Sequence, residues 1–209
     1  MTADRLVLWR HGRTEWNADG RFQGQADVGL DAVGRSQAVQ AARVLAGFAP
    51  AALYSSDLSR AYDTATRLAA VVNLPIQTDK RLREIHVGSW EGLLGSEIRA
   101  QSPELAERLW RGEDVRRSPT GESPGEVAER VAEALGEIAE AAPEGSTVIV
   151  VTHGLAARVG SCRFVGLPFD HWRLMGGLSN CAWISLDRHR SKAYWRIEAY
   201  NAVVSADLG

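Results

Sequence analysis

The sequence predicts an α/β fold in which a mainly parallel sheet is covered by helices on both faces. Two apolar runs without polar alternation, Leu6 to Trp9 and Thr147 to Val151, are typical of strands that are buried on both sides. A His-Gly pair follows each run, His11-Gly12 and His153-Gly154. Between the runs, helical and strand-like stretches alternate as in βα units. Because ligands bind at the carboxyl ends of parallel strands, both pairs should meet at one edge of the sheet.

The other elements follow from hydrophobic periodicity, and we expect all of them to belong to one domain, residues 1–209. The chain is expected to contain helices near 31–47, 57–72 and 124–142, a short strand near 52–55, and edge strands near 181–186 and 194–200.

The middle of the chain, about 94–117, is more polar and helical in pattern. Ser102-Pro103-Glu104 is typical of a helix start, with an N-cap residue followed by proline at the first helical position. We expect the segment around 94–123 to arch over the edge of the sheet as a lid.

Composition excludes several classes of protein. The 209 residues are 45% hydrophobic and 24% charged with a formal net charge of -2, so no basic field indicates nucleic acid or an anionic membrane as a partner. No apolar run approaches the ~20 residues of a membrane-spanning helix, and the N-terminal residues do not resemble a signal peptide, which predicts a cytoplasmic protein. Cys162 and Cys181 lie in no metal-ligand pattern and are expected to be buried free thiols.

The residues that follow the first buried strand indicate phosphate chemistry. Arg10, His11 and Arg13 come directly after it, and Gly12 allows close approach of the backbone. Neutral imidazole is a good nucleophile toward phosphorus, and the planar guanidinium group of arginine matches phosphate oxygens. The alternative, a surface turn with an incidental histidine, accounts for none of the remaining pattern.

Two further residues should reach the same edge of the sheet. Arg60 lies in the first turns of a helix that follows a strand, where a helix N-terminus also favours an anion, although a solvated arginine is the alternative. His153 can donate from one ring nitrogen to a phosphate oxygen in the transition state, and Gly154 can add a backbone N–H. The alternative for His153 is a core histidine whose hydrogen bonds are satisfied.

Glu84 is the candidate general acid. Cleavage of a phosphate monoester needs a proton on the departing oxygen, and a carboxyl group can supply it. Glu84 stands in a loop-like segment with Gly88 and Gly92. Its neighbour His86 is interpreted as a structural or surface histidine.

Other motifs are weaker. The Gly121 to Gly125 segment formally matches the GxSxG nucleophile motif, but no hydrophobic strand precedes it. Ser123 with Glu126 fits a helix capping box instead. The signatures of P-loops, dinucleotide-binding folds and zincins are missing from the sequence. Trp16 and Trp90 lie beside the motifs and are the better tryptophan candidates for contact with a ligand.

Five segments in this order, RHGRTEWN, SSDLSRAYDTA, LREIHVGSWEG, GES and VTHG, resemble the histidine phosphatase superfamily, also called phosphoglycerate mutase-like. The resemblance implies a three-layer α/β/α sandwich without a metal or organic cofactor. It makes His11 the phosphorylated nucleophile and Glu84 the proton donor. The residues that it implies for the phosphate pocket and substrate contacts are Arg10, Arg60, His153, Asn17, Gln23, Gly24, Gly154 and Arg13.

The resemblance leads to a phosphomonoester hydrolase acting on a small phosphorylated metabolite. SSDLSRAYDTA, FQGQAD and MGGLSNCAW are similar to stretches of the actinobacterial glucosyl-3-phosphoglycerate phosphatases, which makes glucosyl-3-phosphoglycerate the expected substrate. One alternative is a cofactor-dependent phosphoglycerate mutase, which the short segment between Glu84 and His153 disfavours. Another is a non-catalytic regulator that binds a phosphorylated ligand, which should lack one of the catalytic residues. The family often forms dimers, so a homodimer is a candidate assembly.

Overall fold

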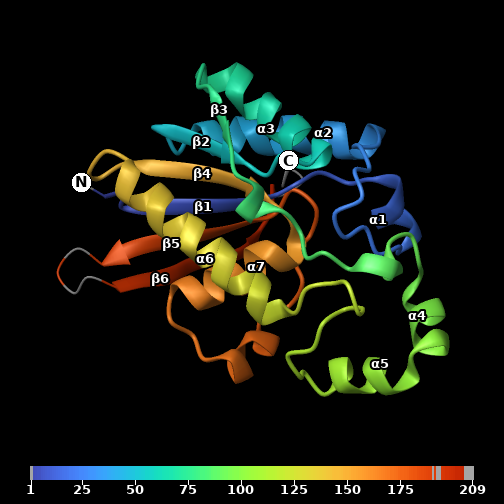
Figure 1. Cartoon of the computed structure of the whole chain (residues 1–209). Coiled ribbons are helices and arrows are strands. Elements are labelled where there is room, and N and C mark those ends of the chain that lie inside the picture. Colours follow the sequence, from blue (N-terminus) through green and yellow to red (C-terminus); the bar gives the residue numbers. More distant parts are fainter. Residues whose placement is uncertain (1, 190, 192–193, 205–209) are drawn as a thin grey trace.

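The computed structural model describes residues 2–189, 191 and 194–204, in which helices cover both faces of a six-stranded sheet (Figure 1). The strands are β1 (Arg5–Arg10), β2 (Ala52–Ser55), β3 (Ile76–Thr78), β4 (Thr147–Thr152), β5 (Trp183–His189) and β6 (Tyr194–Ala202). Their order across the sheet is β3-β2-β4-β1-β5-β6. The first four strands in this order are parallel, and β5 and β6 pair in the antiparallel sense.

Two pairs of helices form the outer layers. On one face lie α2 (Ala32–Ala46) and α3 (Ser59–Val72), and on the other lie α6 (Pro124–Ala141) and α7 (Gly154–Phe164). The predicted three-layer α/β/α sandwich is therefore confirmed. The other helical segments are α1 (Glu15–Asp19), α4 (Gly95–Gln101), α5 (Pro103–Trp110) and the 3₁₀ helices η1 (Lys80–Leu82), η2 (Gly88–Trp90) and η3 (Phe169–Leu174).

β1 explains why the central strands show no polar alternation. Leu6 and Leu8 belong to the hydrophobic cluster that includes α6 and α7, whereas Val7 and Trp9 belong to the cluster that includes α2 and α3. All four side chains are fully buried. Since successive side chains of a strand point to opposite faces and helices cover both, each of these positions must be apolar.

The strand register brings the two His-Gly pairs together. β1 pairs in parallel with β4, and Arg10 lies opposite Thr152 at the end of the ladder. His11 and His153 therefore leave the sheet side by side, as the sequence predicted. β2 pairs with the other side of β4, so the start of α3 lies at the same edge.

The prediction of two edge strands near the C-terminal end is only half right. β5 lies between β1 and β6, and its first four residues are buried, so it is an interior strand. The opposite edge is formed by β3, which the sequence analysis did not predict. β3 has three residues, two of them exposed, and so short a segment carries no periodic signal.

α4 and α5 lie outside the sandwich, beyond the edge of the sheet where the His-Gly pairs lie (Figure 1). Ser102 is the N-cap residue of α5 and Pro103 its first residue, as predicted, but the Ser102 side chain makes no capping hydrogen bond. The lid role of this segment stays a prediction. Across the described residues, no helix combines the length and apolar character needed to cross a bilayer.

The capping box predicted for α6 is confirmed. The Ser123 Oγ accepts a hydrogen bond from the backbone N–H of Glu126, and the Glu126 carboxylate accepts one from the backbone N–H of Ser123. No strand leads directly into Ser123, so the strand–turn–helix of the α/β-hydrolase nucleophile elbow is not formed here.

Candidate active site

A cavity of about 490 Å³ lies beside the ends of β1 and β4, and its walls include residues of η2, α4 and α5. The predicted site residues that line it are Arg10, His11, Asn17, Gln23, Gly24, Arg60 and Glu84. The sheet edge therefore gathers residues that are up to 74 positions apart in the chain.

His11 is a buried, neutral imidazole. Its Nδ1 donates to the carbonyl oxygen of Gly12 at 2.7 Å, so Nε2 carries the free lone pair. Burial, followed by the positive charges of Arg60 and Arg10, lowers the pKa of His11 well below its usual value. A neutral ring with one nitrogen fixed and the other free is the form that can attack an electrophile.

His153 is fully buried and, unlike His11, is not part of the cavity lining. The two ring centroids are 5.2 Å apart. Its Nε2 is 2.9 Å from the Oγ of Ser56, and its Nδ1 is buried without a hydrogen-bond partner. Burial, and then the charge of Arg60, lowers the pKa of His153 well below its usual value. His153 is therefore a second neutral imidazole with one ring nitrogen unused.

Arg10 and Arg60 each present an unsatisfied Nε–H group. Arg60 is fully buried, and its two terminal nitrogens donate to the carbonyl oxygens of Ala26 and Gly24, both at 2.8 Å. One terminal nitrogen of Arg10 donates to the carbonyl oxygen of Leu178. The Nε atoms of both arginines are buried and lack a partner. Burial lowers the pKa of both groups, that of Arg60 to about 10, against the opposing charge of Glu84.

The carboxylate of Glu84 is held by backbone N–H groups. It accepts hydrogen bonds from Ile85 at 3.0 Å, Leu155 at 3.1 Å and Ala156 at 3.0 Å. The last two belong to the first turn of α7, whose backbone N–H groups have no acceptor within the helix. These bonds fix both carboxylate oxygens at the cavity wall.

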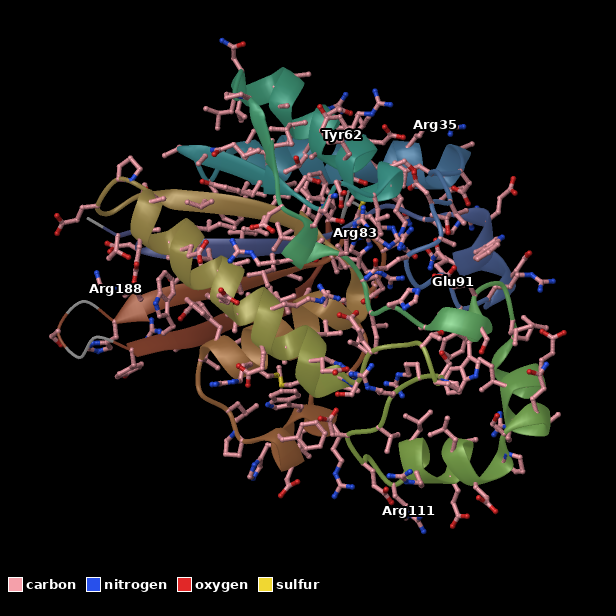
Figure 2. All side chains as sticks on the ribbon, viewed as in Figure 1. Arg35, Tyr62, Arg83, Glu91, Arg111 and Arg188 are labelled. Atoms are coloured by element: carbon pink, nitrogen blue, oxygen red, sulfur yellow. The ribbon has the colours of Figure 1, made fainter. Side chains whose placement is uncertain are left out.

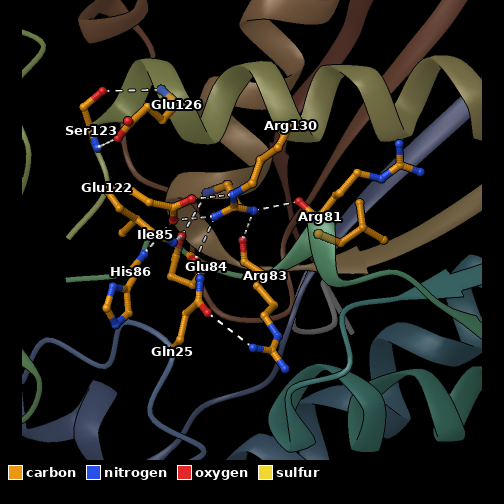
Figure 3. Close-up of polar contacts among 12 residues, drawn as sticks. Gln25, Arg81, Arg83, Glu84, Ile85, His86, Glu122, Ser123, Glu126 and Arg130 are labelled. Atoms are coloured by element: carbon orange, nitrogen blue, oxygen red, sulfur yellow. Dashed lines mark hydrogen bonds and ion pairs between the residues drawn. The ribbon is translucent and has the colours of Figure 1, made fainter. Parts of the chain in front are cut away.

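Arg130, on α6, clamps the segment that carries Glu84 (Figure 3). Its guanidinium group donates to the carbonyl oxygens of Arg81 and Arg83 at 2.7 Å and of Glu84 at 3.0 Å. It also forms a two-pronged ion pair with Glu122 at 2.8 and 2.9 Å. The sequence analysis did not identify Arg130, because these contacts join residues 46 to 49 positions apart and leave no local pattern.

Two side chains at this edge bind neighbouring segments. Arg83 forms a two-pronged ion pair with Asp57 at 2.6 and 2.7 Å, and Glu91 accepts a hydrogen bond from the backbone N–H of Gln25. Both side chains lie on the side of the molecule where β1 and β4 end (Figure 2). They therefore hold the loops around the cavity in place.

The predicted substrate contacts Asn17, Gln23 and Gly24 differ in the hydrogen bonds they make within the protein. The Oδ1 of Asn17 accepts a hydrogen bond from the Nδ2 of Asn180 at 3.1 Å, so its own Nδ2 is left for a ligand. Gln23 is nearly buried, and its Oε1 accepts from the hydroxyl of Thr14 at 3.0 Å. Gly24 adopts the left-handed conformation, with φ of 53°, and its carbonyl oxygen accepts a hydrogen bond from Arg60.

The structure does not bring every predicted residue to the cavity. Arg13 pairs with Asp31, the N-cap residue of α2, at 2.7 Å and does not line the cavity. Gly154, the first residue of α7, is also not part of the lining, but a Cβ there would lie 3.3 Å from the Nε of Arg10. Of the two candidate tryptophans, Trp90 lines the cavity and Trp16 does not.

Arg117 lines the cavity but belongs to no motif. Burial, and then the positive charge of Arg158, lowers the pKa of Arg117 to about 10, while the charge of Glu84 opposes this change. Cys162 and Cys181 are buried free thiols, as predicted. Within the described residues, no group of three or more His, Cys, Asp or Glu is placed to hold a metal ion.

The sequence model of the histidine phosphatase superfamily (branch 1) matches residues 6–203. The chain belongs to the histidine phosphatase superfamily. A glucosyl-3-phosphoglycerate phosphatase from Mycobacterium tuberculosis is 39% identical to this histidine phosphatase, with both chains covered completely. A probable phosphoglycerate mutase from Serratia proteamaculans is 34% identical over 97% of this chain and 95% of its own length.

Solved structures show the same relationship. A mycobacterial glucosyl-3-phosphoglycerate phosphatase in complex with VO3 matches this histidine phosphatase with a TM-score of 0.88 and 39% identity, over 95% of this chain and 99% of that one. The family and the fold that the five motifs indicate are therefore confirmed.

Proposed function

We propose that this histidine phosphatase hydrolyses phosphomonoesters through phosphorylated His11. The observation that carries the proposal is the state of His11. Its ring is neutral, its Nδ1 is bonded to the carbonyl of Gly12, and its free Nε2 belongs to a cavity that two arginines also line. A neutral nucleophile beside two guanidinium groups suits a phosphate ester, because the arginines bind the phosphate oxygens without competing for the lone pair.

The first half-reaction transfers the phosphoryl group to the protein. The unpaired Nε–H groups of Arg10 and Arg60 bind phosphate oxygens. The Nε2 of His11 attacks phosphorus, and the bond from phosphorus to the ester oxygen breaks. The protonated carboxyl group of Glu84 gives its proton to the leaving oxygen. The products are phosphohistidine, the free alcohol and the Glu84 carboxylate.

His153 stabilises the charge that moves onto the phosphoryl oxygens. The Oγ of Ser56 accepts a hydrogen bond from the backbone N–H of Leu58 at 3.3 Å, and its hydroxyl can donate to the Nε2 of His153. This arrangement leaves the proton of the neutral ring on Nδ1, the atom without a partner. Nδ1–H then donates to a phosphoryl oxygen in the transition state.

The second half-reaction returns the protein to its starting state. The Glu84 carboxylate takes a proton from a water molecule, the water oxygen attacks phosphorus, and the bond between phosphorus and the Nε2 of His11 breaks. Inorganic phosphate leaves, and Glu84 is protonated again for the next cycle.

The substrate proposed for this chain is glucosyl-3-phosphoglycerate. The support is the identity of 39% to a glucosyl-3-phosphoglycerate phosphatase over the whole of both chains. Net transfer to substrate, as in a phosphoglycerate mutase, is the second candidate, because a relative with that name is 34% identical. The short segment between Glu84 and His153 favours hydrolysis. Cytoplasmic location and dimerisation stay predictions from the sequence.

The test is a phosphate-release assay without added metal. Wild-type protein and the His11→Ala variant are given glucosyl-3-phosphoglycerate, 3-phosphoglycerate, a fructose phosphate and p-nitrophenyl phosphate. Selective release from the first substrate, lost in the variant, supports both mechanism and substrate. Isomerisation of 3-phosphoglycerate without phosphate release would favour the mutase, and full activity of His11→Ala would rule out the phosphohistidine route.

A further inference from the structure

A second cavity of about 540 Å³ adjoins the one that contains His11. Leu109 and Arg117 line both cavities, so they form the boundary between them. The other walls of the second cavity come from the start of α6, α7, η3 and the residues that follow α5. The mechanism proposed above uses no residue that belongs to the second cavity alone.

The second cavity has an excess of positive charge, with four arginines and two carboxylates in its lining. One of the four, Arg111, is 3.1 Å from Glu113 and lies at the outer end of α5 (Figure 2), so these two charges offset each other. Arg117, Arg158 and Arg173 then face a single carboxylate, Asp170, which is on the surface. The inner part of the cavity is therefore cationic.

Arg117 and Arg158 have no anionic partner in the described part of the chain. The Arg117 side chain makes no hydrogen bond or ion pair there, and Arg158 donates only to the carbonyl oxygen of Met175 at 3.3 Å. Arg158 lies close enough for its charge to lower the pKa of Arg117. Two half-buried cations without a counter-ion are costly, and an anion bound between them removes the cost.

The charge of the subsite favours a monoanion over a dianion. The negative charges of Glu84 and Asp114 also act on Arg117, so they offset part of the positive charge. A carboxylate accepts the two parallel hydrogen bonds of a guanidinium group and carries one charge. Beyond the arginines, Phe169 and Trp172 pack with ring centroids 4.9 Å apart, which gives the cavity an apolar wall on which a sugar ring can lie.

We propose that Arg117 and Arg158 form a second anion subsite that binds the carboxylate of the substrate while its phosphate group lies at His11. The inference rests on the proposed phosphatase function. It explains how one ligand can use both cavities, because Arg117 belongs to each. It also assigns the sugar of a glycosylated substrate to the second cavity, against Phe169 and Trp172.

The test compares two substrates that differ only at one carbon. 3-Phosphoglycerate carries a carboxylate where glycerol 3-phosphate carries a hydroxymethyl group. The quantity measured is the ratio of kcat/KM for the two, in wild type, Arg117→Gln, Arg158→Gln and Arg117→Lys. The control is Arg163→Gln, on the same helix as Arg158, whose exposed side chain pairs with Glu129.

We expect both glutamine variants to lower this ratio at least tenfold, mainly through a higher KM for 3-phosphoglycerate. Arg117→Lys should restore part of the loss because it keeps the charge, and Arg163→Gln should keep the wild-type ratio. Equal losses on both substrates, or an unchanged ratio in Arg158→Gln, would overturn the subsite. If Arg117→Gln does not fold, as judged by circular dichroism, the result for Arg158→Gln decides.

A binding experiment separates this proposal from the proposed function. The His11→Ala protein, with and without Arg158→Gln, is titrated calorimetrically with both compounds. Tighter binding of 3-phosphoglycerate that disappears with Arg158→Gln supports the subsite even if no phosphomonoester is hydrolysed. Equal affinity for the two compounds refutes it even if the phosphatase reaction is established.

Discussion

At the scale of single residues, Gly12 sets the state of His11, the proposed nucleophile. A Cβ on Gly12 would lie 2.4 Å from the carbonyl oxygen of Gly34 in α2, so no larger residue fits without moving backbone. The close packing holds the Gly12 carbonyl where the Nδ1 of His11 donates to it. The small residue thus fixes which ring nitrogen is free.

Glu84→Gln tests the general acid. The amide keeps the size of the side chain but cannot supply a proton, so kcat/KM should fall by about 10² to 10⁴ for alkyl phosphates such as glycerol 3-phosphate. The loss should be much smaller for p-nitrophenyl phosphate, because p-nitrophenolate leaves without a proton. Steady-state kinetics on both substrates check this expectation, and equal losses on the two would remove Glu84 from the acid role.

At the scale of elements, Arg130 joins α6 to the segment that carries Glu84. Its side chain is largely buried, with 18% of the surface exposed, and every hydrogen bond it makes ends on a carbonyl of residues 81–84 or on Glu122. We expect Arg130 to be a positioning residue for Glu84, because removal of its guanidinium group frees three carbonyl groups of that segment.

Arg130→Leu should lower the free energy of unfolding by about 2 to 3 kcal/mol, since it leaves buried carbonyls and a carboxylate unpaired. It should also lower kcat/KM more for glycerol 3-phosphate than for p-nitrophenyl phosphate, a difference that lost stability alone does not produce. Urea unfolding and kinetics measure the two effects. The matched control is Arg163→Leu, whose exposed ion pair should contribute less than about 1 kcal/mol. Equal kinetic losses on both substrates would leave Arg130 a purely structural role.

Ser123→Ala tests the start of α6. Loss of the capping hydrogen bond should lower the free energy of unfolding by about 1 kcal/mol. Phosphate release should be retained, because Ser123 contacts neither His11 nor Glu84 and does not line the cavity. Thermal unfolding and the phosphate assay are the measurements. A folded variant without activity would return Ser123 to consideration as a nucleophile.

At the scale of the whole molecule, folding stability is coupled to pH through the two buried histidines. Burial lowers the pKa of both His11 and His153, so below pH ~6.5 the unfolded chain binds more protons than the folded one. The free energy of unfolding should therefore fall as pH decreases below ~6.5, by up to about 1.4 kcal/mol per histidine at pH ~5.5. Urea unfolding in phosphate-free buffer measures the change.

His153→Gln is the control for this pH dependence. The variant loses one of the two groups, so its free energy of unfolding should decrease less between pH ~7.5 and ~5.5 than that of wild type. If wild type shows the same free energy of unfolding at both pH values, the two histidines bind protons equally in the folded and unfolded states, which contradicts the lowered pKa of His11 and His153.

Much of the fold and part of the site could be predicted from the sequence because the signals are local. Strands that are buried on both faces must be continuously apolar, so Leu6 to Trp9 and Thr147 to Val151 identify the centre of the sheet. Parallel neighbours place His11 and His153 at one edge. The Ser123 and Glu126 pair marks the start of α6 within four residues of sequence.

Only the tertiary structure decided the contacts between distant segments. Ser56 hydrogen-bonds to His153, which is 97 positions away in the sequence, and Arg130 donates to the carbonyl oxygen of Arg83, which is 47 positions away. Arg13 stands in the same motif as His11 but pairs with Asp31, and Arg117 reaches the cavity from a segment without a motif. The sequence by itself determined the family and the centre of the sheet and predicted the nucleophile, because each depends on a local pattern. The side chains that hold the site residues in place come from distant segments. Their contacts depend on which surfaces pack together, and no local pattern encodes that packing.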